Sequence, residues 1–405
     1  MSDEGESAPG SGSPLADVDD KLHEYFTWYP VAKKDFKDAI RSRGLWILSA
    51  VFTLIFISPV GVALYAGGIG PSVPDGGLGM RIIIERFYLD LVTTVLPIVT
   101  LFVGVAAMTK EKTSGSLKIL LSLPFSRRSV IVGKVIGRCA VVAVPFLVAA
   151  SITAVFFSAS RVSFDPEMYA FFMLYSLVFA MVMVSIAVSI SGAVSTTLRS
   201  IIGNAVIYVY FTFMWNTIAN EIGNFLATQV GVSRSFRWNT VLFIKLLSPT
   251  QAYKTLVNSM LTRVSQPVQP QLQSFANRWN LSLSQMSPQQ YSRYNLFNVQ
   301  GSLFSPGLPA ADQRSLCESV VGATYRNVTL TTNNASRTVT VTNGNQTQVF
   351  QNMNVSRNVT QTSSFCTGGS DLPFYLSDPA VVLFLLAWVG IAAAFSYYTF
   401  DRVDL

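Results

Sequence analysis

Six long apolar runs alternate with shorter polar segments along the chain. A membrane-spanning helix needs about 20 mostly apolar residues, because each residue rises about 1.5 Å and the hydrocarbon layer is about 30 Å thick. Each run has about this length, so the pattern predicts six transmembrane helices. Proline lies inside three of the runs, and packed membrane helices accept proline where neighbouring groups satisfy the freed carbonyl. The runs cover residues 45–66, 87–108, 136–158, 168–193, 201–219 and 380–400.

Lysine and arginine gather in alternate connections between these runs. They are frequent before the first run and between the second and third, and Arg199 and Arg402 follow the fourth and sixth runs. Because the cytoplasmic loops of membrane proteins hold the excess of basic residues, we expect both termini and the segment 110–134 in the cytoplasm. The long segment between the fifth and sixth runs is then extracellular, and the membrane is the plasma membrane.

The composition indicates a membrane protein and excludes several other classes. Of the 405 residues, 50% are hydrophobic and 13% are charged, whereas soluble proteins carry about 25% charged residues. The net charge of +7 follows the topology rule and, without a nucleic-acid-binding motif, does not indicate a nucleic-acid partner. The single histidine, His23, lies in the N-terminal tail, so Ser-His and Cys-His catalysis would lack a base. With no Cys/His cluster in the sequence, we predict neither an enzyme nor a metal site.

The segment between the fifth and sixth runs has two parts. Residues 220–264 retain apolar pieces and are predicted to form short or re-entrant helices at the outer leaflet. Residues 265–378 are polar, and TVTVTNGNQTQVF at 338–350 alternates as strands do, with Asn343 and Gly344 suited to a tight hairpin turn. The predicted fold is therefore an all-α polytopic membrane protein of six transmembrane helices, with a small β-rich extracellular domain between helices 5 and 6.

Two features of this outer segment fit an extracellular location. Cys317 and Cys366 stand in one predicted domain, and cysteines outside the cell usually pair. A disulfide between them would stabilise the fold by about 4 kcal/mol in the chain-entropy model. The segment is also rich in Asn-X-Ser/Thr sequons, whose concentration indicates N-glycosylation. The sequons are Asn280, Asn327, Asn334, Asn345, Asn354 and Asn358.

The N-terminal part consists of a tail and a helix. The tail is acidic and rich in Gly, Ser and Pro, which predicts disorder and hints at a halophilic, archaeal source. The helix is amphipathic, and we expect it to lie in the membrane interface. One of its faces is predicted to hold Ala32, Phe36 and Ile40, and the opposite face Lys33, Lys37 and Arg41. The predicted division of the chain is 1–24 (tail), 25–44 (interfacial helix), 45–219 (five spans), 220–264 (outer helices), 265–378 (outer domain) and 379–405 (sixth span and C-terminus).

The basic segment 110–134 contains a second amphipathic stretch. Leu117, Leu120 and Leu121 share one helical face, Pro124 ends the stretch, and Ser126 can cap the helix that follows. Two interpretations stay open on these residues. The segment is either a positively charged loop that only fixes the topology, or a short cytoplasmic helix that passes a push from a partner protein to the two adjoining spans.

The sequence KEKTSGSLKILLSLPFSRRSVIVGK at 110–134 resembles the cytoplasmic loop of ABC-2 type permeases, the membrane subunits of a class of ATP-binding-cassette transporters. Lys118 departs from the family pattern, which often has an acidic residue there. The SPTQAY stretch after the fifth run and the closing FDRVDL also resemble the family, and the large outer segment resembles the subgroup of the nitrous-oxide-reductase maturation permease. The residues that the resemblance assigns to coupling are Glu111, Gly115, Ser116, Leu117, Leu120, Leu121, Ser122, Pro124, Arg127, Arg128, Gly133 and Lys134.

This resemblance implies that the work is divided between proteins. In the family the loop forms a coupling helix that docks on a separate ATPase subunit, so Gly115 to Leu123 would dock there and Glu111 would lie at a gate hinge. The sequence has no G-x-x-x-x-G-K-[ST] motif. The chain would therefore hold no cofactor, and ATP and Mg²⁺ would be bound by the partner ATPase. Six spans are about half of a complete transporter of this class, which implies a homodimer or a heterodimer with a second permease in the lipid membrane.

Polar side chains recur at every fourth residue of the fifth run. At 3.6 residues per helical turn this spacing winds slowly around the axis, so the residues cannot all face one point. Two roles stay open: hydrogen bonding between helices, as polar residues in membranes commonly provide, or lining of a translocation path at the dimer interface. The stripe consists of Asn204, Tyr208, Thr212, Asn216 and Asn220, with Glu221 beside it.

Together these features predict the permease subunit of an ATP-driven ABC-2 exporter. Two alternatives keep the same topology. One is an ABC-like complex that transmits force to an extracellular process and moves no solute. The other is a membrane-anchored surface glycoprotein that works without an ATPase.

Overall fold

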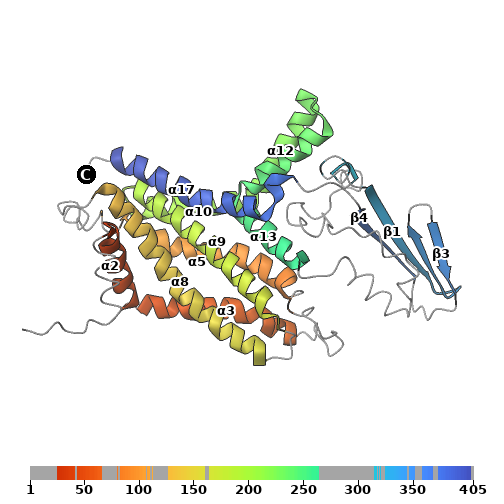
Figure 1. Cartoon of the computed structure of the whole chain (residues 1–405), viewed down its shortest axis with the longest axis horizontal. Helices are drawn as coiled ribbons and strands as arrows, with labels where there is room; N and C mark the ends of the chain where they lie inside the picture. The colour runs from red at the N-terminus through yellow and green to blue at the C-terminus, as the bar shows by residue number, and fades with distance from the viewer. Residues whose placement is uncertain are drawn as a thin grey trace, which may run out of the picture.

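The structure, a computed structural model, consists of a helical bundle and a β-sheet (Figure 1). The predicted tail at 1–24, most of the segment 110–125 and residues 264–313 lie outside the described residues. The structure describes residues 25–41, 43–65, 80, 83–105, 107–109, 112, 126–159, 164–263, 314–316, 318, 320, 324–343, 346–351, 358–367 and 373–402.

Each predicted apolar run corresponds to a helix. Pro59, Pro97 and Pro145 lie inside helices, as the sequence predicted. The fifth run belongs to a long helix in which two π-helical segments interrupt the α-helix, and Gly231, with φ of 69°, ends it in the left-handed conformation that glycine adopts readily. The helices are α3 (Arg43–Tyr65), η1 (Ile84–Tyr88) with α5 (Leu89–Val105), α8 (Arg127–Ala159), α9 (Pro166–Ala193), the composite helix of α10 (Thr197–Val209), η2 (Tyr210–Met214), α11 (Trp215–Phe225) and η3 (Leu226–Val230), and α17 (Asp378–Arg402).

Four helices of the described residues are long and apolar enough to cross a membrane. A fifth candidate is the pair α2 (Tyr29–Ile40) and Arg43–Pro59, which is bent by 77°. α5 is apolar but shorter, and η1 precedes it directly. The helix lengths therefore support four or five membrane-spanning helices, and the six-span topology stays a prediction. The four long candidates are Arg128–Ala159, Pro166–Ala193, Thr197–Val230 and Asp378–Thr399.

The core of the bundle is built around α9. Of the four long candidates it is the most buried, with 67% of its most apolar stretch inside the molecule. α5, α8 and α17 pack against it (Figure 1). Between α3, η1, α8 and α9 lies a group of aromatic rings, in which the centroid of Phe56 is 5.2 Å from that of Phe146, and the centroid of Tyr88 is 5.4 Å from that of Phe172. Because lipid is as apolar as these side chains, close packing rather than the hydrophobic effect holds such helices together.

Two further helices follow the composite helix: α12 (Arg234–Leu246) and α13 (Pro249–Arg263). α12 projects from the side of the bundle, whereas α13 inserts between α9 and α17 (Figure 1). Tyr253 of α13 stacks on Phe179 at 4.7 Å between ring centroids, and its hydroxyl is 2.8 Å from the hydroxyl of Ser176. α13 is thus fixed inside the bundle although many of its side chains are polar.

The turn between α12 and α13 is held by two indole groups. Trp388 of α17 donates a hydrogen bond of 2.7 Å to the carbonyl of Leu247, and Trp215 of α11 donates one of 2.8 Å to the carbonyl of Ile244. Phe211, one turn before Trp215 in the composite helix, has its ring 5.0 Å from that of Trp388. The turn is therefore connected to α11 and α17 at the same point.

Four antiparallel strands form the sheet in the order β3-β2-β1-β4. The Val/Thr alternation noted in the sequence forms β2 and β3, which pair with Asn343 opposite Gln346, so two residues connect them. Gly344, of the predicted turn, lies outside the described residues. In Figure 1 the sheet lies beyond the end of the bundle that α13 occupies. The strands are β1 (Thr324–Asn333), β2 (Thr338–Asn343), β3 (Gln346–Phe350) and β4 (Val359–Thr367).

Candidate functional site

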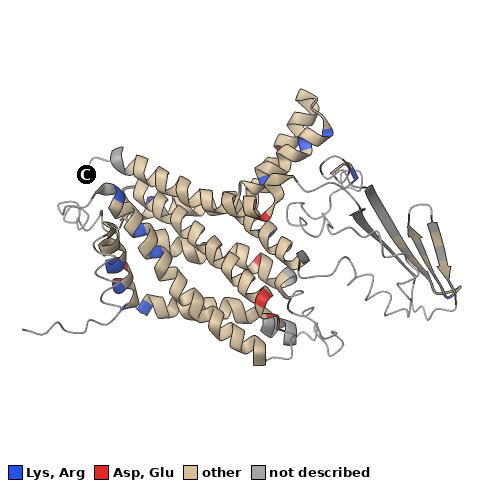
Figure 2. Ribbon diagram, in the orientation of Figure 1, with Lys and Arg blue, Asp and Glu red and all other residues tan. Residues whose placement is uncertain are grey.

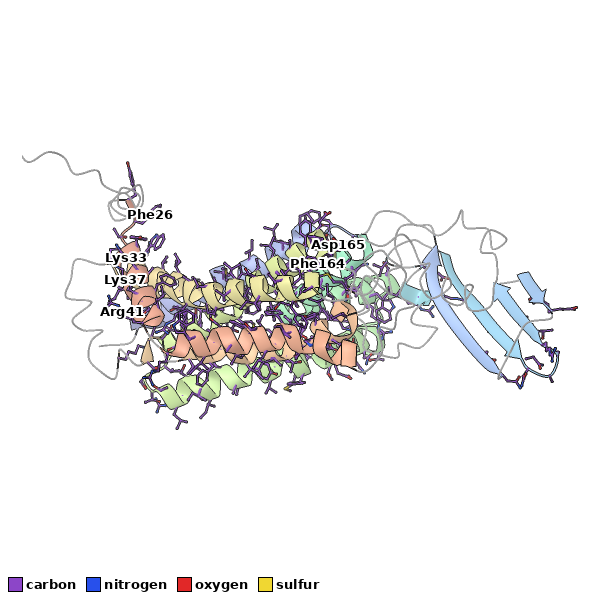
Figure 3. The ribbon with its side chains drawn as sticks, turned by 90° about the horizontal axis from the view of Figure 1, so that it is seen from below. Phe26, Lys33, Lys37, Arg41, Phe164 and Asp165 are labelled. Atoms are coloured by element: carbon purple, nitrogen blue, oxygen red, sulfur yellow. The ribbon has the colours of Figure 1, made fainter. Side chains whose placement is uncertain are left out.

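Basic side chains mark one end of the bundle. Figure 2 shows Lys and Arg gathered on α2 and on the first turns of α3 and α8, with a smaller group along α12. In Figure 3, Lys33, Lys37 and Arg41 lie on α2 at this end, and Phe164 and Asp165 lie at the opposite end. Asp165 caps α9 there by accepting hydrogen bonds from the first backbone N–H groups of that helix. The basic end is the end from which the segment 110–125 leaves and returns.

α2 packs on the beginning of α8 through two glycines. A methyl group on Gly133 would lie 2.8 Å from both the carbonyl oxygen of Trp28 and Cβ of Val31, and one on Gly137 would lie 3.0 Å from Cβ of Asp35. Glycine at these positions therefore lets the two helices approach closely. Val31 and Ala32 are buried in this contact.

The face of α2 that packs on α8 overlaps only in part with the face predicted to be apolar, and the interfacial location of α2 stays a prediction. The packed face contains Val31, Ala32 and Asp35, while Phe36 is half-buried and Ile40 is 43% exposed. Ala32 belongs to both faces, and Gly133 and Gly137 of α8 give the flat surface on which the packed face lies.

A buried ion cluster lies in the same contact. Asp35 Oδ1 accepts a hydrogen bond of 2.8 Å from Lys134 Nζ, and Asp35 Oδ2 lies 2.9 Å from Arg138 Nε. The side chains of Lys134 and Asp35 are only 3% and 10% exposed. Lys134, predicted as a residue of the ATPase contact, thus lies between two helices of this chain.

The first turn of α8 is linked to the chain before α2. Ser126 caps α8, because its hydroxyl accepts a hydrogen bond of 3.1 Å from the backbone N–H of Ser129. The Ser129 hydroxyl is 2.6 Å from that of Thr27. Arg128 places its guanidinium 4.9 Å from the ring centroid of Tyr397 in α17. The C-terminal end of the segment 110–125 is therefore attached to the chain before α2 and to α17 as well as to α8.

The N-terminal end of that segment is attached to the corner between α9 and α10. The hydroxyl of Ser191 accepts hydrogen bonds from the backbone N–H groups of Met108 and Thr109, at 3.1 and 3.2 Å. Lys112 Nζ donates to the carbonyls of Gly192 and Val194, at the C-terminal end of α9. A cation is favourable there because the carbonyl end of a helix is partially negative. Burial lowers the pKa of Lys112 from its ordinary value.

Of the twelve residues assigned to coupling, the structure describes four. Arg127 begins α8, while Arg128, Gly133 and Lys134 have the contacts given above. The remaining eight lie outside the described residues: Glu111, Gly115, Ser116, Leu117, Leu120, Leu121, Ser122 and Pro124.

The polar stripe of the composite helix is only partly hydrogen-bonded. Asn204 donates to the carbonyl of Ser200 in its own helix at 2.9 Å, and Tyr208 donates to the carbonyl of Thr94 in α5 at 3.1 Å. Among the described residues, no partner reaches the buried oxygens Asn204 Oδ1, Thr212 Oγ1 and Asn216 Oδ1. Asn220 is half-buried and Glu221 is exposed. One member of the stripe, Tyr208, therefore donates a hydrogen bond to another helix. Three side-chain oxygens of the stripe could each still accept a hydrogen bond.

The π segment η2 keeps this stripe on one side of the helix. Asn204 and Asn220 are 220 − 204 = 16 positions apart, and an α-helix would turn the second about 160° away from the first. A π turn contains about one extra residue, which removes roughly 100° and leaves about 60°. The expectation that the stripe winds away from a common side was therefore wrong, because it assumed a regular α-helix.

The outer residues predicted to carry modifications are placed in part. Asn334 and Asn358 are exposed, and Asn358 Oδ1 accepts a hydrogen bond of 2.7 Å from the backbone N–H of Asn334. Asn327 lies in β1, and Cys366 lies in β4. The other predicted residues lie outside the described residues, and the disulfide stays a prediction. They are Asn280, Asn345, Asn354 and Cys317.

Comparison with known proteins gives a family match over most of the chain. The sequence model of the family described as "ABC-2 family transporter protein" matches residues 29–405. A probable ABC transporter permease protein NosY from Pseudomonas aeruginosa is 28% identical over 125 residues, which are 30% of this chain and 42% of that protein. The protein of the same description from Stutzerimonas stutzeri is 27% identical over 120 residues, which are 29% of this chain and 41% of that protein. The chain thus aligns with about four-tenths of the length of these relatives.

Proposed function

Because the chain belongs to the ABC-2 transporter family, we propose that it is the permease subunit of an ATP-driven exporter in the plasma membrane. The single observation that carries this proposal is the structure around the segment 110–125. Its two ends are attached to different helices of the bundle, at the end where the basic side chains gather. A protein that pushed on this segment would therefore act on several membrane helices at once.

The proposed topology has six transmembrane helices, with both termini and the basic end of the bundle in the cytoplasm. The distribution of Lys and Arg supports it, since basic residues stay on the cytoplasmic side. The sheet is then extracellular, where the sequons can be glycosylated and Cys317 can pair with Cys366. Cysteine labelling tests this orientation at two exposed residues. Lys37→Cys should react only from the cytoplasmic side and Asn334→Cys only from outside.

A separate ATPase is the proposed partner on the cytoplasmic side. It binds ATP and Mg²⁺, because the sequence of this chain holds no phosphate-binding loop. Residues Gly115 to Leu123 form the proposed docking helix. Lys134 acts in this proposal through α2, since its ammonium group is buried against Asp35.

The composite helix is the proposed interface with a second permease copy, either identical or related. It is the least apolar of the four long candidates and also the least buried, with 11% of its most apolar stretch inside the molecule. Its exposed side chains include Ile202, Val206 and Phe213, and close packing of such side chains against a second copy can hold membrane helices together. A second copy would cover it, and the polar stripe would then lie beside the translocation path.

Purification of the full chain from its native membrane tests the proposal. We expect an ATPase subunit to co-purify and its ATP hydrolysis to respond to the transported solute. A chain that never associates with an ATPase would be a surface glycoprotein. The force-transmitting alternative would be supported by two results together. An ATPase would associate with the chain but no solute would stimulate its ATP hydrolysis, and chemical labelling of the outer sheet would change when nucleotide is added.

A further inference from the structure

We propose that Lys112, Ser191 and Ser200 are positioning residues that connect the coupling segment to the polar stripe of the composite helix. The inference rests on the proposed function and names the path by which a movement of the segment reaches α10. Each link in this path is a hydrogen bond between described residues.

The first link joins the N-terminal end of the segment to the end of α9. Ser191 binds two consecutive backbone N–H groups, those of Met108 and Thr109, so it fixes both the position and the direction of the chain as it leaves α5. Lys112 adds a second attachment one turn later, on the last carbonyls of α9. Two attachments a few residues apart prevent the segment from pivoting freely at this corner.

The second link joins the same part of α5 to α10. Ser200 Oγ donates a hydrogen bond of 2.7 Å to the carbonyl of Val105, and Thr197 Oγ1 lies 3.3 Å from Thr109 Oγ1. The carbonyl of Ser200 in turn accepts the hydrogen bond from Asn204, the first member of the polar stripe. These hydrogen bonds, joined through the backbone of α5 and of the α9–α10 corner, connect Lys112 to Asn204.

Close packing gives these bonds little room to relax. A methyl group on Gly104 would lie 2.4 Å from Cβ of Ala187, so the backbone of α5 is in direct contact with α9. A methyl group on Gly192 would lie 2.9 Å from both the sulfur of Met108 and the hydroxyl of Ser396 in α17. Because packed interfaces deform in discrete steps and not continuously, a displacement of the segment would move α5, the α9–α10 corner and α10 together.

The opposite end of the segment has a different attachment. It leads through Ser126 into α8, which is fixed to α2 by Gly133, Gly137 and the Asp35 ion pair. A push on the segment is thus divided between α10 at one end and the α2–α8 pair at the other. The measurable consequence is a nucleotide-dependent change in the distance between α8 and α10.

The experiment measures that distance in the complex of the full chain with its co-purified ATPase, in lipid nanodiscs. Spin labels are placed at Ile136→Cys in α8 and Ile202→Cys in α10, both exposed, in a Cys139→Ser background. Distances are compared without nucleotide and with ATP plus vanadate. In the otherwise unaltered chain we expect a shift. With Ser191→Ala and Ser200→Ala together, we expect the population that shifts to fall at least about twofold, while ATPase binding and ATP hydrolysis continue.

The matched control is the pair Ser151→Ala and Ser158→Ala. These exposed serines of α8 donate to carbonyls of their own helix, so the same atoms are removed without touching the α9–α10 corner. If the double variant Ser191→Ala, Ser200→Ala does not assemble with the ATPase, Lys112→Gln is measured in its place. Lys112→Arg is then expected to restore the shift in distance. A full shift in the altered chains, equal to that of the control, would overturn the inference. Absence of any ATPase partner for the unaltered chain would instead contradict the proposed function itself.

Discussion

Asp35 and Lys134 form an ion pair with 2.8 Å between Oδ1 and Nζ, across the contact between α2 and α8. The two residues are 99 positions apart in the sequence, and both side chains are nearly buried. Removing one partner of a buried pair is costly because the other charge is left without compensation. The pair therefore makes α2 part of the bundle and not a helix that only rests on the membrane surface.

Replacing this carboxylate tests that role. We expect Asp35→Asn to destabilise the chain by about 3 kcal/mol, because Lys134 and Arg138 would both lose the carboxylate that they contact across α2 and α8. The loss should appear as a lower thermal unfolding temperature in detergent. Asp38→Asn is the control, since Asp38 is exposed on the same helix. Equal unfolding temperatures for the two variants would contradict the structural role of the pair.

A second prediction concerns the close approach of α2 to α8. We expect Gly133→Ala to cost about 1–3 kcal/mol of stability, as overpacking does, because the added methyl group would collide with the carbonyl of Trp28 and with Val31. Gly390→Ala in α17 is the comparison, since nothing lies within 4 Å of its added methyl group. Unfolding of the two variants should differ clearly, and faster proteolysis within α2 should accompany the loss in the first.

The polar stripe allows its two interpretations to be separated. Asn216→Leu should leave the single chain folded, because the buried Oδ1 of Asn216 has no partner among the described residues to lose. If the stripe lines a path, the variant assembles normally and the ATPase of the complex no longer responds to solute. If the permease pair instead dissociates on size-exclusion chromatography, hydrogen bonding between helices is the correct interpretation.

The predicted disulfide can be counted chemically. The sequence has three cysteines, and Cys139 is a free thiol in the described structure. Chain denatured without reductant should therefore take up one maleimide-polyethylene-glycol label, and reduced chain should take up three. Cys317→Ser should raise the unreduced count to two by freeing Cys366. Three labels on the unreduced, unaltered chain would show that the pair is absent.

The sequence predicted the helices well because lipid imposes a single strong requirement. A spanning segment must be long, apolar and internally hydrogen-bonded, and Pro59, Pro97 and Pro145 do not break that pattern. The sequence did not reveal η2, because the contact that goes with it, Phe211 on Trp388 of α17, joins residues far apart in the chain and leaves no local pattern.

The candidate site was predicted less completely. On an amphipathic helix, Asp35 has the pattern of a solvent-facing acid, and only the three-dimensional contact shows it to be buried. A usable signal was present in α8, where Gly133 and Gly137 have the four-residue spacing that lets helices approach closely. Ser191 and Ser200 were missed because single serines in apolar helices carry no pattern of their own.

The two tryptophans at the turn between α12 and α13 restrict how the bundle can open. Trp215 and Trp388 come from different helices, yet their indole groups bind backbone carbonyls only three residues apart. Separating α11 from α17 would break at least one of these hydrogen bonds, so the two helices and the turn are expected to tilt as one piece. The proposed translocation path would then run beside this piece and not between α11 and α17.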